Sequence, residues 1–480
     1  MEHPADDNLF LDYWVEKGVL QMPERIIGCF GMTELEHGSN VAGLLTTATL
    51  DKKTDEFIIH TPFLGATKWW IGGAASSATH CSVFAQLMVD GKRYGTKTFI
   101  VPIRDTKTFQ TLPGVLIGDI GKKMGRDGVD NGYLQFSYVR VPRDYMMMKY
   151  TQVSKDGKVT DTAAPQMAYG ALISGRVGMV TDSAVISQKG LTIAIRYGIV
   201  RRQFSAGTND VETQILDYPI HQRRLMPLLT QAIAFQFASR TLQLKYEDVM
   251  ETRAHLGPSQ LDPKNHAAEI KELHVMAAGL KAFSTWACLD SLEKCRQTCG
   301  GHGYSAYSTF PQLISDFAIQ CTWEGDNTVL MMQSGRALVS YLEDLQKGKS
   351  LPAGVSYLKT AASHTKSDGS LSVEDIAHGF ERVATVAVED AFAEYSSFLK
   401  KGQNKEKALE SCSNLRFVAG RLHTIAWVRV SPSLSFFRRK LTLVVFVALQ
   451  ELLGRSGKDP VWGRTKSLGA SLPIVWIVAG

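Results

Sequence analysis

The chain has 480 residues, enough for two to four domains with large cores. Hydrophobic residues make up 44% of the sequence and charged residues 21%. These shares are typical of a globular protein and exclude a disordered chain, a collagen or a coiled coil. Lys and Arg number 53 against 47 Asp and Glu, a net charge of +6. So small a surplus does not indicate a nucleic-acid partner, and an anionic small ligand suits it equally well.

The seven Cys residues form no CxxC pair and no extracellular disulfide pattern, which indicates a reducing compartment. The longest apolar run, residues 441–449, is shorter than the roughly 18 to 20 residues that cross a bilayer, so no membrane span is expected. The first ten residues are acidic and do not resemble a secretory signal. The last three, Val478, Ala479 and Gly480, are not the Ser-Lys-Leu peroxisomal signal.

Residues 28–141 are rich in Thr, Val, Ile and aromatics, interrupted about every eight to twelve residues by Gly, Pro or Asp-Gly. This pattern is typical of short strands joined by turns. The predicted strands are TTATL, EFIIH, KTFIVPI and YLQFSYVRV. We therefore expect an all-β middle domain.

Helical spacing follows. Apolar residues three, four or seven apart predict long helices over residues 173–195, 270–287, 326–345 and 373–399. Because one face of each is strongly apolar, we expect a helical bundle. The stretch LGPSQLDPKN is predicted to be a loop between helices, and GKSLPAGVS a linker. Beyond about residue 425 no period is sustained, and the tail has no assignment.

Two glycine-containing stretches of the middle domain are candidates for a binding site. CFGMTELEHGSN occupies residues 29–40, and KWWIGGAA begins at Lys68. Loops of this kind let the backbone approach a ligand and supply hydroxyl and amide partners for a phosphate or a polar heterocycle. Simple turns are the commoner role. Trp69 and Trp70 suit either a core or the flat wall of a planar cofactor.

Two later motifs could bind phosphate. YGIVRRQF ends the first long helix, where Arg201 and Arg202 would either complement the helix dipole or clamp a phosphate. QTCGGHGYSAY lacks the third Gly of the dinucleotide fingerprint and follows a helix, which argues against a Rossmann fold. Its glycines suit either a helix C-cap or a backbone bed for a pyrophosphate.

Glu324 lies between Trp323 and Gly325, just ahead of the third predicted helix. An acid among apolar groups has a raised pKa, which suits it for proton abstraction. Capping of the helix by Glu324, Asp326 and Asn327 is the simpler interpretation of the same residues. Spacing alone favours the cap.

In this order and spacing, the four stretches resemble the acyl-CoA oxidase family, a branch of the acyl-CoA dehydrogenase superfamily, over residues 24–425. The resemblance implies an α+β multidomain fold: a middle β-barrel domain, then helical bundle domains, with FAD between them. Residues 1–24 would be a remnant of an N-terminal helical domain, 25–145 the middle β-barrel domain, and 165–345 the FAD-binding and dimerisation bundle. Residues 346–425 would form a C-terminal helical domain, and 426–480 an atypical tail.

The resemblance also implies roles for single residues. Glu324 matches the catalytic base, Thr33 would bond the flavin ring, and Ser39 would approach the pyrophosphate. Gly72 stands where related dehydrogenases carry a Thr beside the flavin, which leaves space for O2. Arg176 suits two places equally: the acyl-CoA path, where a cation would face an anionic ligand, or the surface of a helix. Motifs that reach the FAD of a neighbouring subunit in a homodimer are matched by Arg201, Gln203, Phe204, Gln297, Gly300 and Gly301.

The implied reaction oxidises acyl-CoA to trans-2-enoyl-CoA, the first step of fatty acid β-oxidation, with O2 reduced to H2O2. Glu324 would remove the α-proton while a hydride leaves for the flavin, and the Glu324 N–H would stabilise the enolate oxygen. The alternatives are an acyl-CoA dehydrogenase with a protein acceptor, or a non-catalytic truncated paralogue that binds acyl-CoA or a partner subunit. No metal is expected, because His37 and His302 match no metal-binding pattern. Family habit implies the peroxisome.

Overall fold

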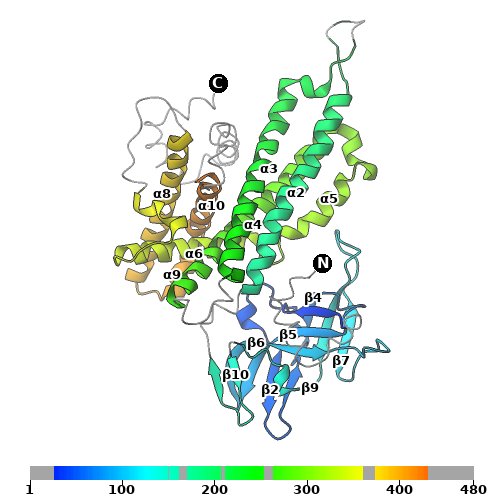
Figure 1. Cartoon of the computed structure of the whole chain (residues 1–480), viewed down its shortest axis with the longest axis vertical. Helices are drawn as coiled ribbons and strands as arrows, with labels where there is room; N and C mark the ends of the chain where they lie inside the picture. Colours follow the sequence, from blue (N-terminus) through cyan, green and yellow to red (C-terminus); the bar gives the residue numbers. More distant parts are fainter. Residues whose placement is uncertain are drawn as a thin grey trace. The chain divides into compact units, whose positions relative to one another are not determined.

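A computed structural model of the chain describes residues 26–149, 151–161, 170–205, 207, 211–252, 263–360 and 373–430 (Figure 1). It divides into two compact units, Met1–Ala168 and Tyr169–Gly480. Strands and short 3-10 helices form the first, the sheet unit, and helices form the second, the helical unit. The predicted α+β class, with a sheet domain followed by helices, is therefore confirmed.

Two sheets and a hairpin make up the sheet unit. The larger sheet contains β1 (Gly28–Gly31), β2 (Thr47–Asp51), β3 (Glu56–His60), β5 (His80–Val89), β6 (Lys92–Pro102) and β9 (Val139–Pro142). Its order is β1-β5-β2-β3-β9, with β6 on β5. The smaller sheet has the order β4-β8-β7, from β4 (Lys68–Gly72), β8 (Asn131–Phe136) and β7 (Val115–Asp119). The hairpin pairs β10 (Thr151–Val153) with β11 (Val159–Asp161).

The four predicted strands exist, with one difference. YLQFSYVRV is not one strand, because Tyr138 is left-handed, with φ 53°, and divides it into β8 and β9, which belong to different sheets. The prediction missed β5, whose residues are mostly buried and so lack the alternation of a half-exposed strand. KWWIG, predicted as a loop, is strand β4 with an irregular register between Lys68 and Ile71.

Three long helices of the helical unit lie side by side: α2 (Gly170–Val200), α3 (Pro219–Tyr246) and α4 (Pro263–Thr298) (Figure 1). The helix α6 (Asn327–Gln346) contacts α4, α8 (Val373–Lys400) and α10 (Ser413–Val430). The shorter elements are α5 (Phe310–Ala318), α7 (Tyr357–Thr360), α9 (Lys405–Ser411), η10 (Gly300–Tyr304), η12 (Ile319–Cys321) and η13 (Ala353–Val355).

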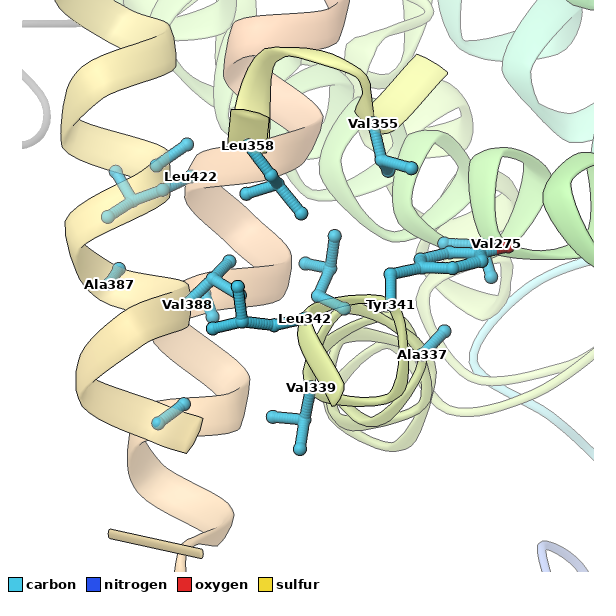
Figure 2. Close-up of a cluster of buried hydrophobic side chains, with 14 of the residues drawn as sticks. Val275, Ala337, Val339, Tyr341, Leu342, Val355, Leu358, Ala387, Val388 and Leu422 are labelled. Atoms are coloured by element: carbon cyan, nitrogen blue, oxygen red, sulfur yellow. The ribbon is translucent and has the colours of Figure 1, made fainter. Parts of the chain in front are cut away.

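A hydrophobic core joins α6 to its neighbours, and Figure 2 shows side chains of α4, η13, α7, α8 and α10 gathered around α6. Val355 of η13 is buried in this core, and the N–H of Gly354 donates to the carboxylate of Glu272 at 2.7 Å. GKSLPAGVS is therefore a packed connection rather than the free linker that its composition predicted. The division of the helices between residues 165–345 and 346–425 stays a prediction.

All four predicted helices are confirmed as α2, α4, α6 and α8. The predicted loop LGPSQLDPKN lies mostly outside the described residues, since α4 begins at Pro263. The prediction missed two long helices: α3, in which Arg and Gln interrupt the apolar pattern, and α10, which continues to Val430. It also missed the shorter helices α5, α7 and α9. The rest of the unassigned tail lies outside the described residues. In the described part of the chain, every helix is too short or too polar to cross a bilayer.

Candidate active site

Glu324 occupies a turn between η12 and α6 that has an uncommon backbone. Its φ is 56°, and Gly325 follows with φ 106°. A left-handed conformation costs a non-glycine residue roughly 1–3 kcal/mol, so the surrounding structure must hold it in place. Gly325 could not carry a side chain, because a Cβ there would lie 2.8 Å from Leu330.

Capping of α6 does not explain Glu324. The side chain of Asp326 is the cap, since it accepts the N–H groups of Thr328 at 2.9 Å and Val329 at 3.3 Å. Asn327 is fully buried, and its amide donates to the hydroxyl of Thr285 at 2.9 Å. Of the three residues that could cap the helix, Asp326 therefore does so, and Glu324 and Asn327 do not.

One oxygen of the Glu324 carboxyl is shielded from water, although the residue as a whole is half-buried. Its Oε2 atom is buried and has no hydrogen-bond partner among the described residues. It rests against α2 at Gly175, where a Cβ would lie 2.8 Å from the carboxyl carbon. The pKa of Glu324 is raised overall, because the effect of burial exceeds the opposite effect of the nearby charges of Arg176 and Lys281. A carboxyl group in this state is a stronger base than an exposed glutamate.

Two buried cations bind successive carbonyl groups of the turn. Arg176 on α2 donates from Nε to the Glu324 oxygen at 2.9 Å, and Lys281 on α4 donates from Nζ to the Gly325 oxygen at 2.7 Å. Arg176 is 4% exposed and Lys281 is fully buried. The structure thus places Arg176 beside Glu324, while its expected role on the acyl-CoA path stays a prediction.

A second candidate site is a pocket of about 870 Å³ in the helical unit, where α2 and α4 end. Arg224 and His221 line it together with Tyr197 and Tyr218. It brings together all six residues assigned to the FAD of a neighbouring subunit: Arg201, Gln203, Phe204, Gln297, Gly300 and Gly301. Two guanidinium groups and several amides suit a phosphorylated ligand.

Gly300 and Gly301 are compatible with both interpretations of their motif, a helix C-cap and a backbone bed for a pyrophosphate. Gly300 is left-handed, with φ 58°, and ends α4 as a C-cap glycine does. A Cβ on Gly300 or Gly301 would meet no atom within 4 Å, so their backbone is open to a ligand. Gly303 differs, because a Cβ there would collide with the carbonyl of Arg296. Packing therefore requires a glycine at position 303.

The sheet unit holds Thr33, Ser39 and Gly72. The Thr33 hydroxyl donates to the backbone carbonyl of Trp69. The backbone N–H of Trp69 in turn donates to the backbone carbonyl of Thr33 at 3.0 Å. Ser39 is exposed. Gly72 ends β4, and a Cβ there would meet only Asn131, at 3.9 Å. The role of this position beside the flavin stays a prediction.

Trp70 belongs to the irregular part of β4 and is not a core residue. Its φ is 67° and 54% of its surface is exposed. A bulky residue in this conformation is a rare, strained feature that clusters at functional sites. Trp69 instead stacks on Tyr133, with 5.4 Å between the ring centres.

A buried ion pair anchors the loop that carries Thr33. Lys68 Nζ donates to Glu34 Oε1 at 3.0 Å, and both side chains are fully buried. Glu34 also accepts the N–H groups of Leu45 at 2.7 Å and Thr46 at 2.9 Å. Burial alone would raise the pKa of Glu34, but the Lys68 charge and these bonds outweigh it and lower that pKa.

We expect Lys68→Met to lower the free energy of unfolding by about 3–5 kcal/mol, because the variant leaves the Glu34 carboxylate buried without its cation. Chemical denaturation measures the change. Lys52→Met is the matched control, since Lys52 pairs with Asp90 at the surface, and it should cost little. Equal losses in the two variants would show that the Glu34 pair does not anchor the loop.

Comparison with known proteins shows where this arrangement belongs. Residues 29–139 match the acyl-CoA dehydrogenase middle domain, and residues 169–339 match the acyl-CoA oxidase C-alpha1 domain. Acyl-coenzyme A oxidase 3 of Yarrowia lipolytica is 47% identical over 86% of this chain and 59% of its own. The crystal structure of acyl-CoA oxidase 1 from the same yeast matches with a TM-score of 0.87 and 41% identity, over 94% of this chain and 68% of its own.

This chain belongs to the acyl-CoA oxidase family. The structure of Caenorhabditis elegans acyl-CoA oxidase-1, complexed with FAD and ATP, also matches, with a TM-score of 0.80 and 31% identity, over 93% of this chain and 67% of its own. The chain spans about three fifths of the length of the curated relatives it matches.

Sequence reasoning missed two residues that shape the Glu324 site of this acyl-CoA oxidase family member. Lys281 lies four residues after Ala277, on the apolar face of the predicted helix 270–287, where a lysine is out of place. That was a usable signal. Gly175 gave none, because a glycine in a helix acquires meaning only from the side chain that packs on it.

Proposed function

We propose that the chain is an FAD-dependent acyl-CoA oxidase that converts acyl-CoA to trans-2-enoyl-CoA and reduces O2 to H2O2. The observation that carries the proposal is the Glu324 carboxyl, whose Oε2 atom is buried and has no partner among the described residues, in a left-handed turn held by two cations. Family membership gives this carboxyl its substrate. By the habit of the family we also propose a peroxisomal location.

FAD fits the second pocket. The open backbone at Gly300 and Gly301 allows close approach of a phosphate, and Arg201 supplies positive charge. Gln203, Gln297 and Phe204 would complete the contacts to the adenylate half. The C. elegans relative holds FAD. We assign Thr33, Ser39 and Gly72 of the sheet unit to the flavin and pyrophosphate.

We also propose a homodimer, because large apolar side chains are exposed at the same pocket. Its lining includes Phe204 and Ile220, which are 76% and 68% exposed, and the neighbouring Tyr304 and Tyr307 are also exposed. Large apolar side chains that gather at a surface are typical of an interface. A second subunit would cover them and share the FAD, as the family resemblance of the stretch YGIVRRQF, residues 197–204, implies.

The mechanism that we propose starts with the weak acidity of the thioester α-carbon. Glu324 Oε2 takes the α-proton, since this atom has no competing partner among the described residues. Developing charge on the thioester oxygen needs a donor, and the Glu324 N–H has no acceptor among those residues. Arg176 stabilises the ionised carboxyl before the transfer. FAD, when bound, accepts the β-hydrogen as hydride and passes the electrons to O2.

Gly72 favours the oxidase over a dehydrogenase. A residue with no side chain leaves space at this end of β4, which gives O2 a route that a Thr would narrow. A non-catalytic paralogue would keep the fold without the chemistry. The Glu324 turn argues against it, because a strained backbone and a buried unpaired carboxyl have no structural benefit.

The purified full chain tests the proposal. We expect a yellow protein with flavin absorbance near ~450 nm that bleaches on addition of acyl-CoA without oxygen. Under air, the same addition should produce H2O2 in proportion to the enoyl-CoA formed. Bleaching without peroxide would identify a dehydrogenase, and a colourless protein that ignores acyl-CoA would support the non-catalytic alternative.

A further inference from the structure

Lys281 is an unusual residue for the interior of a helical unit. It lies in the middle of α4 with no exposed surface, and its ammonium group binds two neutral oxygens: the Gly325 carbonyl at 2.7 Å and the Asn327 side-chain oxygen at 3.0 Å. Lysine is almost never fully buried unless it is paired with a charge, because its desolvation is costly. A structural role alone would be filled at lower cost by an apolar side chain.

The partners of Lys281 clamp the Glu324 turn to α4. Asn327 accepts from Lys281 and donates to Thr285 at 2.9 Å and to the carbonyl of Ala282 at 3.2 Å, both one turn or less further along α4. The ammonium group therefore lies between α4 and the two residues that follow Glu324. Because Gly325 directly follows Glu324, a substitution of Lys281 that releases the Gly325 carbonyl should also shift the position of Glu324.

The charge of Lys281 also acts on that carboxyl. The titratable and charged groups around the turn come from four elements: Arg176 on α2, Lys281 and His274 on α4, Cys321 of η12, and Asp326 before α6. His274 is neutral near pH 7, since burial lowers its pKa to about 4. Burial also raises the pKa of the Cys321 thiol. Among the residues that the structure describes, Arg176 and Lys281 are thus the two cations that act on the Glu324 carboxyl, opposed by Asp326.

We propose that Lys281 is a positioning residue for Glu324: its ammonium holds the Gly325 carbonyl, and with it the left-handed turn, while its charge stabilises the Glu324 carboxylate. The proposal rests on the role of Glu324 as the base. Arg176 and Lys281 divide the work, since Arg176 binds the carbonyl of Glu324 and Lys281 binds that of Gly325.

The first test is the pH profile of flavin bleaching by acyl-CoA in the full chain. Lys281→Met should move the acid limb of the rate to higher pH, because the carboxylate loses one of its two cations and binds its proton more tightly. The difference from the unsubstituted chain should narrow above about pH 8, where Lys281 loses its own charge, since burial lowers its pKa to about 8. Lys281→Gln, which keeps a hydrogen-bond donor, should show the same shift.

Lys294→Met is the matched control, because Lys294 lies on the same helix, pairs with Asp290 at the surface and is 40% exposed. It should leave the profile in place. An unchanged acid limb in both Lys281 variants would overturn the proposal. Failure of the unsubstituted chain to bleach would instead count against the proposed function.

The second test needs neither substrate nor FAD. Above the acid limb found in the first test, where the Glu324 carboxyl is ionised, Glu324→Gln removes a charge and should raise the midpoint of thermal unfolding more in the Lys281→Met background than in the unsubstituted chain. Below the acid limb, where the carboxyl is protonated, the two increments should agree. Equal increments at both pH values would show that the Lys281 charge does not act on Glu324, and would overturn the proposal.

Discussion

Glu324→Gln should slow the bleaching of bound flavin by acyl-CoA by about 10²–10⁴-fold or more, the range that general-base catalysis supplies. The amide keeps the shape of the side chain but cannot accept the α-proton. The yellow colour should remain, because Glu324 does not line the pocket assigned to FAD. Anaerobic stopped-flow absorbance measures the rate, and normal bleaching in the variant would remove Glu324 as the base.

The pH dependence gives the same variant a second readout. The pKa of Glu324 is raised in the folded chain, mainly by burial, so the rate should fall with decreasing pH at a higher pH than for an exposed glutamate. A raised pKa in the folded state means that ionisation of Glu324 destabilises the fold as the pH rises through that pKa. Glu324→Gln should therefore be at least as stable as the unsubstituted chain at pH 7. Glu343→Gln, on the partly exposed side of α6, controls for loss of a glutamate.

The elements that the sequence predicted correctly are those whose periodicity comes from a single apolar face. The helices α2, α6 and α8 bury mainly one face, and β2 and β3 alternate between the core and the outside. The exception is α4, which keeps an apolar period although residues 275–282 are all buried. The pattern is lost in β5, which is buried on both faces, and at Tyr138, where one run of β-forming residues serves two sheets. Neither feature is local, since both depend on which strands lie alongside.

The same limit applies to the candidate site. The family resemblance singled out Glu324 and the residues of the pocket at the end of α2 and α4, because each motif that carries the resemblance lies on a continuous stretch of chain. The cations that bind the turn were harder to predict, since Arg176 and Lys281 lie 148 and 43 or more residues from it in sequence. Only the fold of α2 and α4 brings them to the same two carbonyl groups.

The contact between Gly175 and Glu324 separates activity from stability. A Cβ at Gly175 would lie 2.8 Å from Oε1 and 3.0 Å from Oε2, too close for the carboxyl to stay where it is. The atoms that must move are the free end of a flexible side chain, so Gly175→Ala should not disturb the helix. Alanine in place of glycine inside a helix should even stabilise the fold by about 0.5–1 kcal/mol.

We therefore expect Gly175→Ala to be slow and stable at once. Displacing a catalytic group by about 1 Å costs on the order of 10²-fold in rate, and the loss should appear in kcat rather than in substrate binding. Gly178→Ala is the matched control, because Gly178 lies three residues further along α2 and a Cβ there would meet nothing within 4 Å. It should gain the same stability and keep full activity, as measured by thermal unfolding and anaerobic bleaching. Equal rates in the two variants would show that the Glu324 carboxyl does not work from its position against α2, whereas a slow Gly175 variant that unfolds normally would locate the base there.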